Sequence, residues 1–120
     1  MRILLKSLGF NPGPALQGHV RLRLEGALAH WASRLGRAVV RVADANGPRG
    51  GLDKLCSIQL RLPHRTFVVV TAVAADYYSA VDLAVRRACR AVARVMDRRV
   101  RSRGTRRTLA LEALPLGSSE

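Results

Sequence analysis

The chain has 120 residues, the size of one domain with one modest hydrophobic core. Apolar residues make up 48% of it, which excludes a disordered chain, so the formal net charge of +13 belongs to a folded body. Such a charge favours an anionic partner, most often nucleic acid and secondarily an acidic membrane surface, while the absence of a run of about 18 apolar residues argues against a membrane span.

Two features place the protein in the cytoplasm. The first ten residues, MRILLKSLGF, lack the long apolar segment and cleavage site of a targeting peptide, so we interpret them as mature protein. Cys56 and Cys89 have no CxxC spacing and lie on apolar stripes, as reduced core thiols do.

The first third of the chain predicts a strand followed by a helix. Residues 1–6 alternate, with Ile3 and Leu5 on one face, and a turn cluster then ends at Pro14. From residue 15 to about residue 35, apolar side chains recur at helical spacing, although Gly18 and Gly26 each weaken a helix by about 1 kcal/mol. We expect tertiary packing to hold this helix in place.

The middle of the chain predicts three consecutive strands. Residues 37–45 form one, and the glycine-rich segment 46–51 reads as a hairpin loop because it lacks a phosphate-loop motif and a following helix. Residues 54–62 alternate as in a half-buried strand, and 63–65 form a tight connection. Residues 66–73 are apolar on both faces, so this strand is either central in its sheet or covers something, such as another chain.

The last long helix is predicted over residues 76–103, with Asp76 as its N-cap and Gly104 as its stop. One stripe of this helix is apolar and faces a core: Val81, Ala84, Val85, Ala88, Val92 and Val95. A second stripe is basic: Arg87, Arg90, Arg94, Arg98 and Arg101. Residues 104–120 are expected to form a flexible tail beyond a domain of residues 1–103.

The predicted order is therefore β-α-β-β-β-α, which is an α+β fold in two layers. Three antiparallel strands and a first strand joined by a right-handed crossover would make a four-stranded sheet with both helices on one face.

No catalytic or metal-binding constellation is evident, and we expect neither an enzyme nor a cofactor. His19, His30 and His64 have no partners at catalytic or ligand spacing, and the carboxylates are scattered without a close pair. Asp82 is expected to form a surface ion pair with Arg86, four residues on.

The arginine stripe predicts phosphate binding. Asp97 is the only acid between Arg86 and Arg103, so mutual repulsion of the cations would be relieved by an anionic partner. Aromatic residues are only 4% of the chain and form no stacking platform, which favours structured RNA over splayed single-stranded bases.

Residues 50–94 resemble the family of ribosome hibernation-promoting factors and ribosome-associated inhibitors. The most specific piece is Asp76-x-Tyr78-x-Ala80-Val81-Asp82, followed by cations at Arg87, Arg90 and Arg94. The family's first helix is matched by Pro14-Ala15-Leu16 with His19, Val20, Arg23 and Leu24, and the similarity extends over residues 1–101. The strand and helix order is also that family's double-stranded-RNA-binding-domain-like fold.

This resemblance implies a protein of stressed or stationary bacterial cells that binds the small ribosomal subunit, blocks translation and preserves idle ribosomes. By position, the resemblance assigns rRNA contacts to Arg87, Arg90, Arg94 and Arg23, while helical geometry adds Arg98 and Arg101. Arg86 and Arg34 complete the candidate set. Residues 104–120 cannot be the dimerisation domain of the long family members.

Two alternatives stay open. The chain could be a general structured-RNA-binding module with no part in hibernation, which shares every charge argument. It could also be a protein-interaction or dimerisation domain that uses the apolar strand 66–73, in which case association would be insensitive to salt.

Overall fold

The structure is a computed structural model that describes residues 1–44 and 53–101, with only the backbone of residues 99–101. Within these residues the elements are β1 (Arg2–Leu8), α1 (Pro14–Ala27), the short 3-10 helix η1 (Ala29–Arg34), β2 (Arg37–Asp44), β3 (Lys54–Leu62), β4 (Thr66–Ala74) and α2 (Tyr77–Arg101). The loop predicted at 46–51 and the tail predicted at 104–120 lie outside the described residues.

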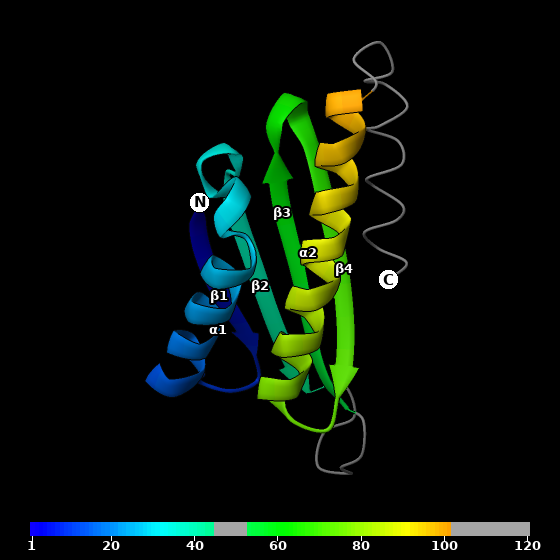
Figure 1. The fold of residues 1–120 in the computed structure, drawn as a ribbon. Coiled ribbons are helices and arrows are strands. Elements are labelled where there is room, and N and C mark those ends of the chain that lie inside the picture. The colour runs from blue at the N-terminus through cyan, green and yellow to red at the C-terminus, as the bar shows by residue number, and fades with distance from the viewer. Residues whose placement is uncertain (45–52, 102–120) are drawn as a thin grey trace.

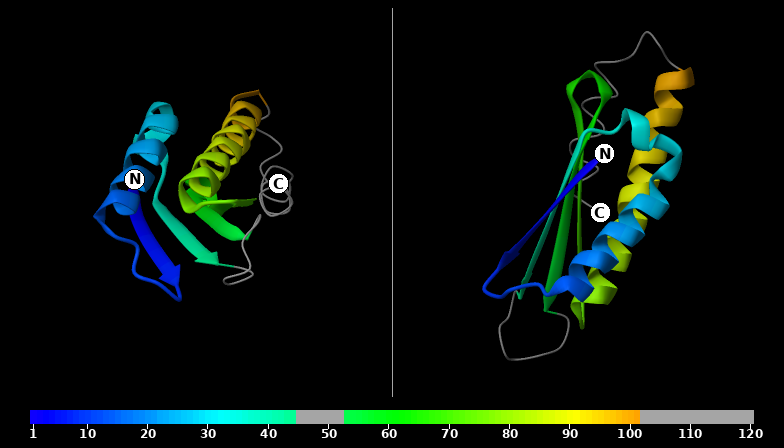
Figure 2. Two further views of the ribbon diagram at one scale, coloured as in Figure 1. Left: turned by 90° about the horizontal axis from the view of Figure 1, so that it is seen from below. Right: turned by 90° about the vertical axis from the view of Figure 1, so that its left-hand side faces the viewer.

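The described strands form one sheet in the order β1-β2-β3-β4. β1 runs parallel to β2, and the other neighbours are antiparallel. Both helices lie on the same face of this sheet, as Figures 1 and 2 show. The predicted α+β fold in two layers is therefore confirmed.

The core lies between the sheet and the helices because each strand alternates. Val40, Ile58 and Val68 point to the helices and are fully buried. The whole apolar stripe predicted for the last helix is buried against them: Val81, Ala84, Val85, Ala88, Val92 and Val95. No helix in the described part of the chain is both long and apolar enough to cross a lipid bilayer.

The first helix is shorter than predicted. α1 ends at Ala27, and Leu28 leaves the helical conformation with φ −108° and ψ 15° before η1 continues to Arg34. Gly26 weakens the last turn, and the break still lets Leu28 and Leu35 reach the core, where each is buried. The periodicity persisted across the break, so the sequence pattern suggested one continuous helix.

The strand boundaries agree with the prediction within about two residues. β1 extends to Leu8 and is followed by Gly9, whose φ of 87° suits a residue without a side chain. The tight connection at 63–65 is present, and both His64 and Arg65 adopt left-handed backbone angles there, with φ of 61° and 60°.

The last strand is not central in the sheet. β4 pairs only with β3 and lies at the edge. On the face away from the helices, Phe67, Val69 and Thr71 are half-buried and Val73 is 42% exposed. Its apolar second face is thus the outer face of an edge strand.

Candidate nucleic-acid interface on the helices

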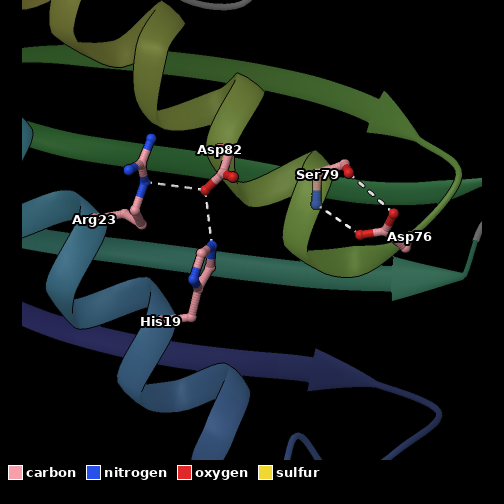
Figure 3. Close-up of polar contacts among 5 residues, drawn as sticks. All are labelled: His19, Arg23, Asp76, Ser79 and Asp82. Atoms are coloured by element: carbon pink, nitrogen blue, oxygen red, sulfur yellow. Dashed lines mark hydrogen bonds and ion pairs between the residues drawn. The ribbon is translucent and has the colours of Figure 1, made fainter.

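α2 is the element that carries most of the candidate arginines, and its start is defined by a side-chain cap. The backbone N–H of Ser79 donates to Asp76 Oδ1 at 2.8 Å, and Ser79 Oγ donates to Asp76 Oδ2 at 2.9 Å (Figure 3). These hydrogen bonds stabilise the carboxylate and hold the pKa of Asp76 below its ordinary value. The predicted N-cap is confirmed, and it determines the phase of the following turns.

The side chains of the predicted arginine stripe differ in their exposure. Arg86 and Arg90 are exposed, whereas Arg87 is half-buried because its Nη1 donates to the backbone carbonyl of Thr71 in β4 at 2.8 Å. Arg94 and Arg98 are also half-buried. Arg101 is the last residue of α2, and its side chain lies outside the described part of the structure.

α1 supplies two basic groups that converge on a carboxylate of α2. His19 Nε2 lies 2.7 Å from Asp82 Oδ1, and Arg23 Nε lies 3.1 Å from the same oxygen (Figure 3). Since a carboxylate only accepts, Nε2 of His19 carries the hydrogen of this contact. The prediction that Asp82 pairs with Arg86 is wrong, because the packing of α1 on α2 brings these two donors to it. Arg34 is exposed at the end of η1.

A groove of about 350 Å³ runs between the two helices and is basic on both sides. Arg23 lines it from α1 and Arg86 from α2. Gly26 lines it as well, and an added Cβ at this position would meet nothing within 4 Å. Asp82 also lines the groove, so its charged lining consists of two guanidinium groups and one carboxylate.

The two cysteines differ in environment. Cys56 is fully buried, and burial raises the pKa of its thiol to about 12. Cys89 is only half-buried, lines the interhelical groove, and its Sγ donates to the carbonyl of Ala27 at 3.5 Å. The interpretation as core thiols holds for Cys56, and Cys89 is partly buried and packs against the edge of the core, where the apolar stripe of α2 meets the groove.

The structure also contains a charged cluster that the sequence did not predict. Lys54 Nζ lies 3.3 Å from Asp44 Oδ2 and 3.1 Å from Asp53 Oδ1, and the Asp53 residue is fully buried. The hydrogen bond that Lys54 donates to Asp53 raises the pKa of Lys54, with Asp44 adding to the effect. Both carboxylates contact the same ammonium group, because the β2–β3 register places Asp44 opposite Lys54.

This cluster has a structural role. The Lys54 ammonium lies 5.8 Å from the centre of the Tyr77 ring, which stacks on Phe10 at 4.5 Å. Burial raises the pKa of the Tyr77 hydroxyl, with a further contribution from Asp44. The contacts join the β2–β3 hairpin to the first turn of α2. In the described residues no group of three His, Cys, Asp or Glu side chains is placed to hold a metal ion.

Comparison with known proteins agrees with this geometry. The sequence model of the family described as "Sigma 54 modulation protein / S30EA ribosomal protein" matches residues 3–100. The N-terminal domain of Thermus thermophilus Protein Y is 27% identical, with a TM-score of 0.66 over 78% of this chain and 98% of that one.

A second solved structure shares the fold. A ribosomal subunit interface protein from Coxiella burnetii is 18% identical and has a TM-score of 0.66 over 81% of this chain and 99% of that one. No curated protein sequence matches the chain. The family to which the motif around Asp76 pointed is thereby confirmed.

Proposed function

The chain belongs to the Sigma 54 modulation protein / S30EA ribosomal protein family, and from this premise we propose that it is a hibernation factor. It docks on the small ribosomal subunit in the cytoplasm, blocks translation and preserves idle ribosomes. Its helices make the contact, and its partner there is the phosphate backbone of the rRNA. Members of the set Arg23, Arg34, Arg86, Arg87, Arg90, Arg94, Arg98 and Arg101 bind these phosphates.

The observation that carries this proposal is the basic surface formed jointly by α1 and α2. Arg86 and Arg90 are exposed on α2, and Arg23 faces Arg86 across the groove. Within the described residues Asp97 is the only carboxylate of α2 beyond Asp82. Cations that have few acids near them gain most from phosphates, since binding removes their mutual repulsion and releases counterions.

Arg87 contributes in a different way. A guanidinium has five N–H donors, and the hydrogen bond to the Thr71 carbonyl uses one of them. This contact orients the planar group against β4 and leaves further donors for a phosphate. It also occupies a backbone acceptor of the edge strand, which disfavours pairing of β4 with a strand of another chain.

Sedimentation with purified small subunits, large subunits and whole ribosomes at low and moderate salt tests the proposal. We expect saturable binding to small subunits at about one protein each, and a large loss in the variant Arg87→Ala/Arg90→Ala/Arg94→Ala. The matched control is the lysine triple variant at the same positions, which keeps the charge and should keep the salt dependence of the binding. Both variants should melt like the parent.

Other outcomes identify the alternatives. Equal, non-saturating binding to every RNA would indicate a general RNA-binding module. Self-association that persists at high salt without subunit binding would indicate a dimerisation domain that uses strand β4. An alanine variant with undiminished affinity would move the site away from α2.

A further inference from the structure

No element that the structure describes covers the face of the sheet opposite the helices, and the side chains of this open face form ordered rows. The strand register places Arg2 beside Arg37, and Arg37 and Arg61 line the same hollow on this face. Two residues further along β1, Leu4 lies beside Val39. Another two residues on, Lys6 lies beside Arg41. Because side chains on one face are two residues apart, about 6.6 Å separates each row from the next.

This open face is basic, and its cations have no acidic partner among the described residues. The five cations are exposed: Arg2, Lys6, Arg37, Arg41 and Arg61. None of the five takes part in an ion pair with any residue that the structure describes. Asp44 is the only carboxylate within the described strands, and it belongs to the alternation that points toward the helices. Like charges directly opposite one another destabilise a sheet, so this arrangement carries a cost in the free protein.

The two basic rows enclose a hollow. A cavity of about 250 Å³ is lined by Arg37 and Arg61 from one row and by Lys6 and Arg41 from the other. The row between them contributes Val39 and Gln59, and Phe67 completes the lining. The side chains of the middle row are shorter than the cations on both sides, which gives four charged groups around a shallow floor.

One wall of the hollow is held in position. The guanidinium carbon of Arg61 lies 5.8 Å from the centre of the Phe67 ring, a cation–π contact. Gly36 donates its backbone N–H to the carbonyl of Arg61 at 2.9 Å. A Cβ at Gly36 would lie 3.4 Å from Arg61 Cβ and 3.5 Å from its Cδ, so the glycine leaves the space in which the arginine stem lies.

We propose that this open sheet face is a second RNA-binding surface, which seats backbone phosphates of an RNA segment in the hollow between Arg37, Arg61, Lys6 and Arg41. The inference rests on the proposed function in so far as the RNA is ribosomal. Arginine offers paired donors that match phosphate oxygens, and rows at fixed intervals on a rigid sheet suit a polymer with regularly repeated charges. A protein that binds RNA through both layers would lie between two RNA segments.

A direct test places a chemical probe on this face. Gln59 lies on the floor of the hollow, so Gln59→Cys carries a photo-crosslinker there. Cys89→Ser removes the half-buried thiol, and Cys56 stays unlabelled because it is fully buried and its pKa is raised to about 12. A second protein carries the probe on α2 at the exposed Ser79→Cys in the same background.

Crosslinking is performed with purified small ribosomal subunits and with a labelled RNA hairpin. We expect RNA adducts from both probe positions. Adducts from position 79 without any from position 59, in a saturated complex, would overturn the sheet-face proposal and leave the proposed function standing. Adducts from position 59 alone would support the sheet face and contradict docking by the helices.

A variant series gives an independent measurement. Arg37→Ala/Arg41→Ala/Arg61→Ala should lower affinity for the hairpin roughly a hundredfold at 0.1 M salt and reduce the slope of log affinity against log salt by about 3. The matched lysine triple should keep the slope. An alanine triple that folds normally and binds RNA with an unchanged slope would overturn the proposal, as would restriction of its defect to anionic lipid vesicles.

Discussion

The helix layer and the open sheet face both carry many cations, but the two groups differ in whether they have partners within the molecule. On the helices, Arg21 pairs with Glu25, Arg23 with Asp82, and Arg87 with a backbone carbonyl of β4. On the sheet, five exposed cations make no ion pair with any described residue. Several cations of the helices are thus already engaged in ion pairs or hydrogen bonds within the molecule.

The difference shows that a row of cations in a sequence can be partly neutralised by contacts that the fold creates. A helical cation can meet a carboxylate on its own helix or on the neighbouring helix, or a backbone carbonyl of the sheet. Cations on an open sheet face have only each other, with backbones about 5 Å apart across strands and about 13 Å apart along them, because an uncharged row lies between the two basic rows. Repulsion between two such charges in water is below about 1 kcal/mol, so a folded sheet tolerates it and a phosphate can relieve it.

Val92→Asp should have the largest effect, because it should unfold the domain and so remove both faces. Val92 is fully buried between α2 and the sheet, so an ionised carboxylate there has no partner and no water. We expect the cooperative thermal transition in circular dichroism to be lost, together with RNA binding by both faces. Arg90→Asp on the exposed side of the same helix is the control and should melt cooperatively. A cooperatively melting Val92→Asp protein would contradict the phase of α2.

Combining one substitution from each face tests whether the two faces bind RNA independently. Arg37→Ala and Arg90→Ala should each lower affinity for an RNA hairpin by roughly fivefold to tenfold at 0.1 M salt. The residues lie on opposite sides of the sheet, so the free-energy costs of the two substitutions should add within about 0.5 kcal/mol in the double variant. A double variant no weaker than either single variant would mean that both residues contact one RNA segment.

Asp82→Asn should strengthen RNA binding by the helix face, because it removes an acidic partner of the cations there. The substitution removes the charge that holds Arg23 and His19, so Arg23 becomes available to phosphate and RNA affinity should rise about threefold or more. The cost in stability should be at most about 1 kcal/mol. Asp97→Asn is the control with the same change in charge. An equal rise in both variants, measured by hairpin titration, would mean that Asp82 does not hold Arg23 back.

Asp76→Ala should have the smallest effect of these substitutions, a loss of stability at the start of α2. Since the folded-state pKa of Asp76 is lowered, its contribution to stability is present above its unfolded pKa and is lost as pH falls through the folded value. The variant should melt at a lower temperature than the parent at neutral pH, and the two should converge in acid. Asp76→Asn, which can still cap, should melt close to the parent at neutral pH. A gap that does not change with pH would contradict this role.

Local pattern predicted most of the secondary structure because the relevant forces are local. The alternation in residues 54–62 and the 3.6-residue period of α2 predicted which side chains are buried, and Asp76 predicted where α2 begins. α1 was predicted too long, because its apolar periodicity continues through Leu28 and Leu35 although the backbone changes at Leu28.

Periodicity, capping and a local motif were enough to predict the fold class, the phase of α2 and the family. Which charges are compensated depends on packing: Asp82 meets Arg23 and His19 of α1 instead of Arg86, and Asp44 and Asp53 both contact Lys54. Pairing of charges depends on distances between residues remote in the chain, which strand register and helix packing establish.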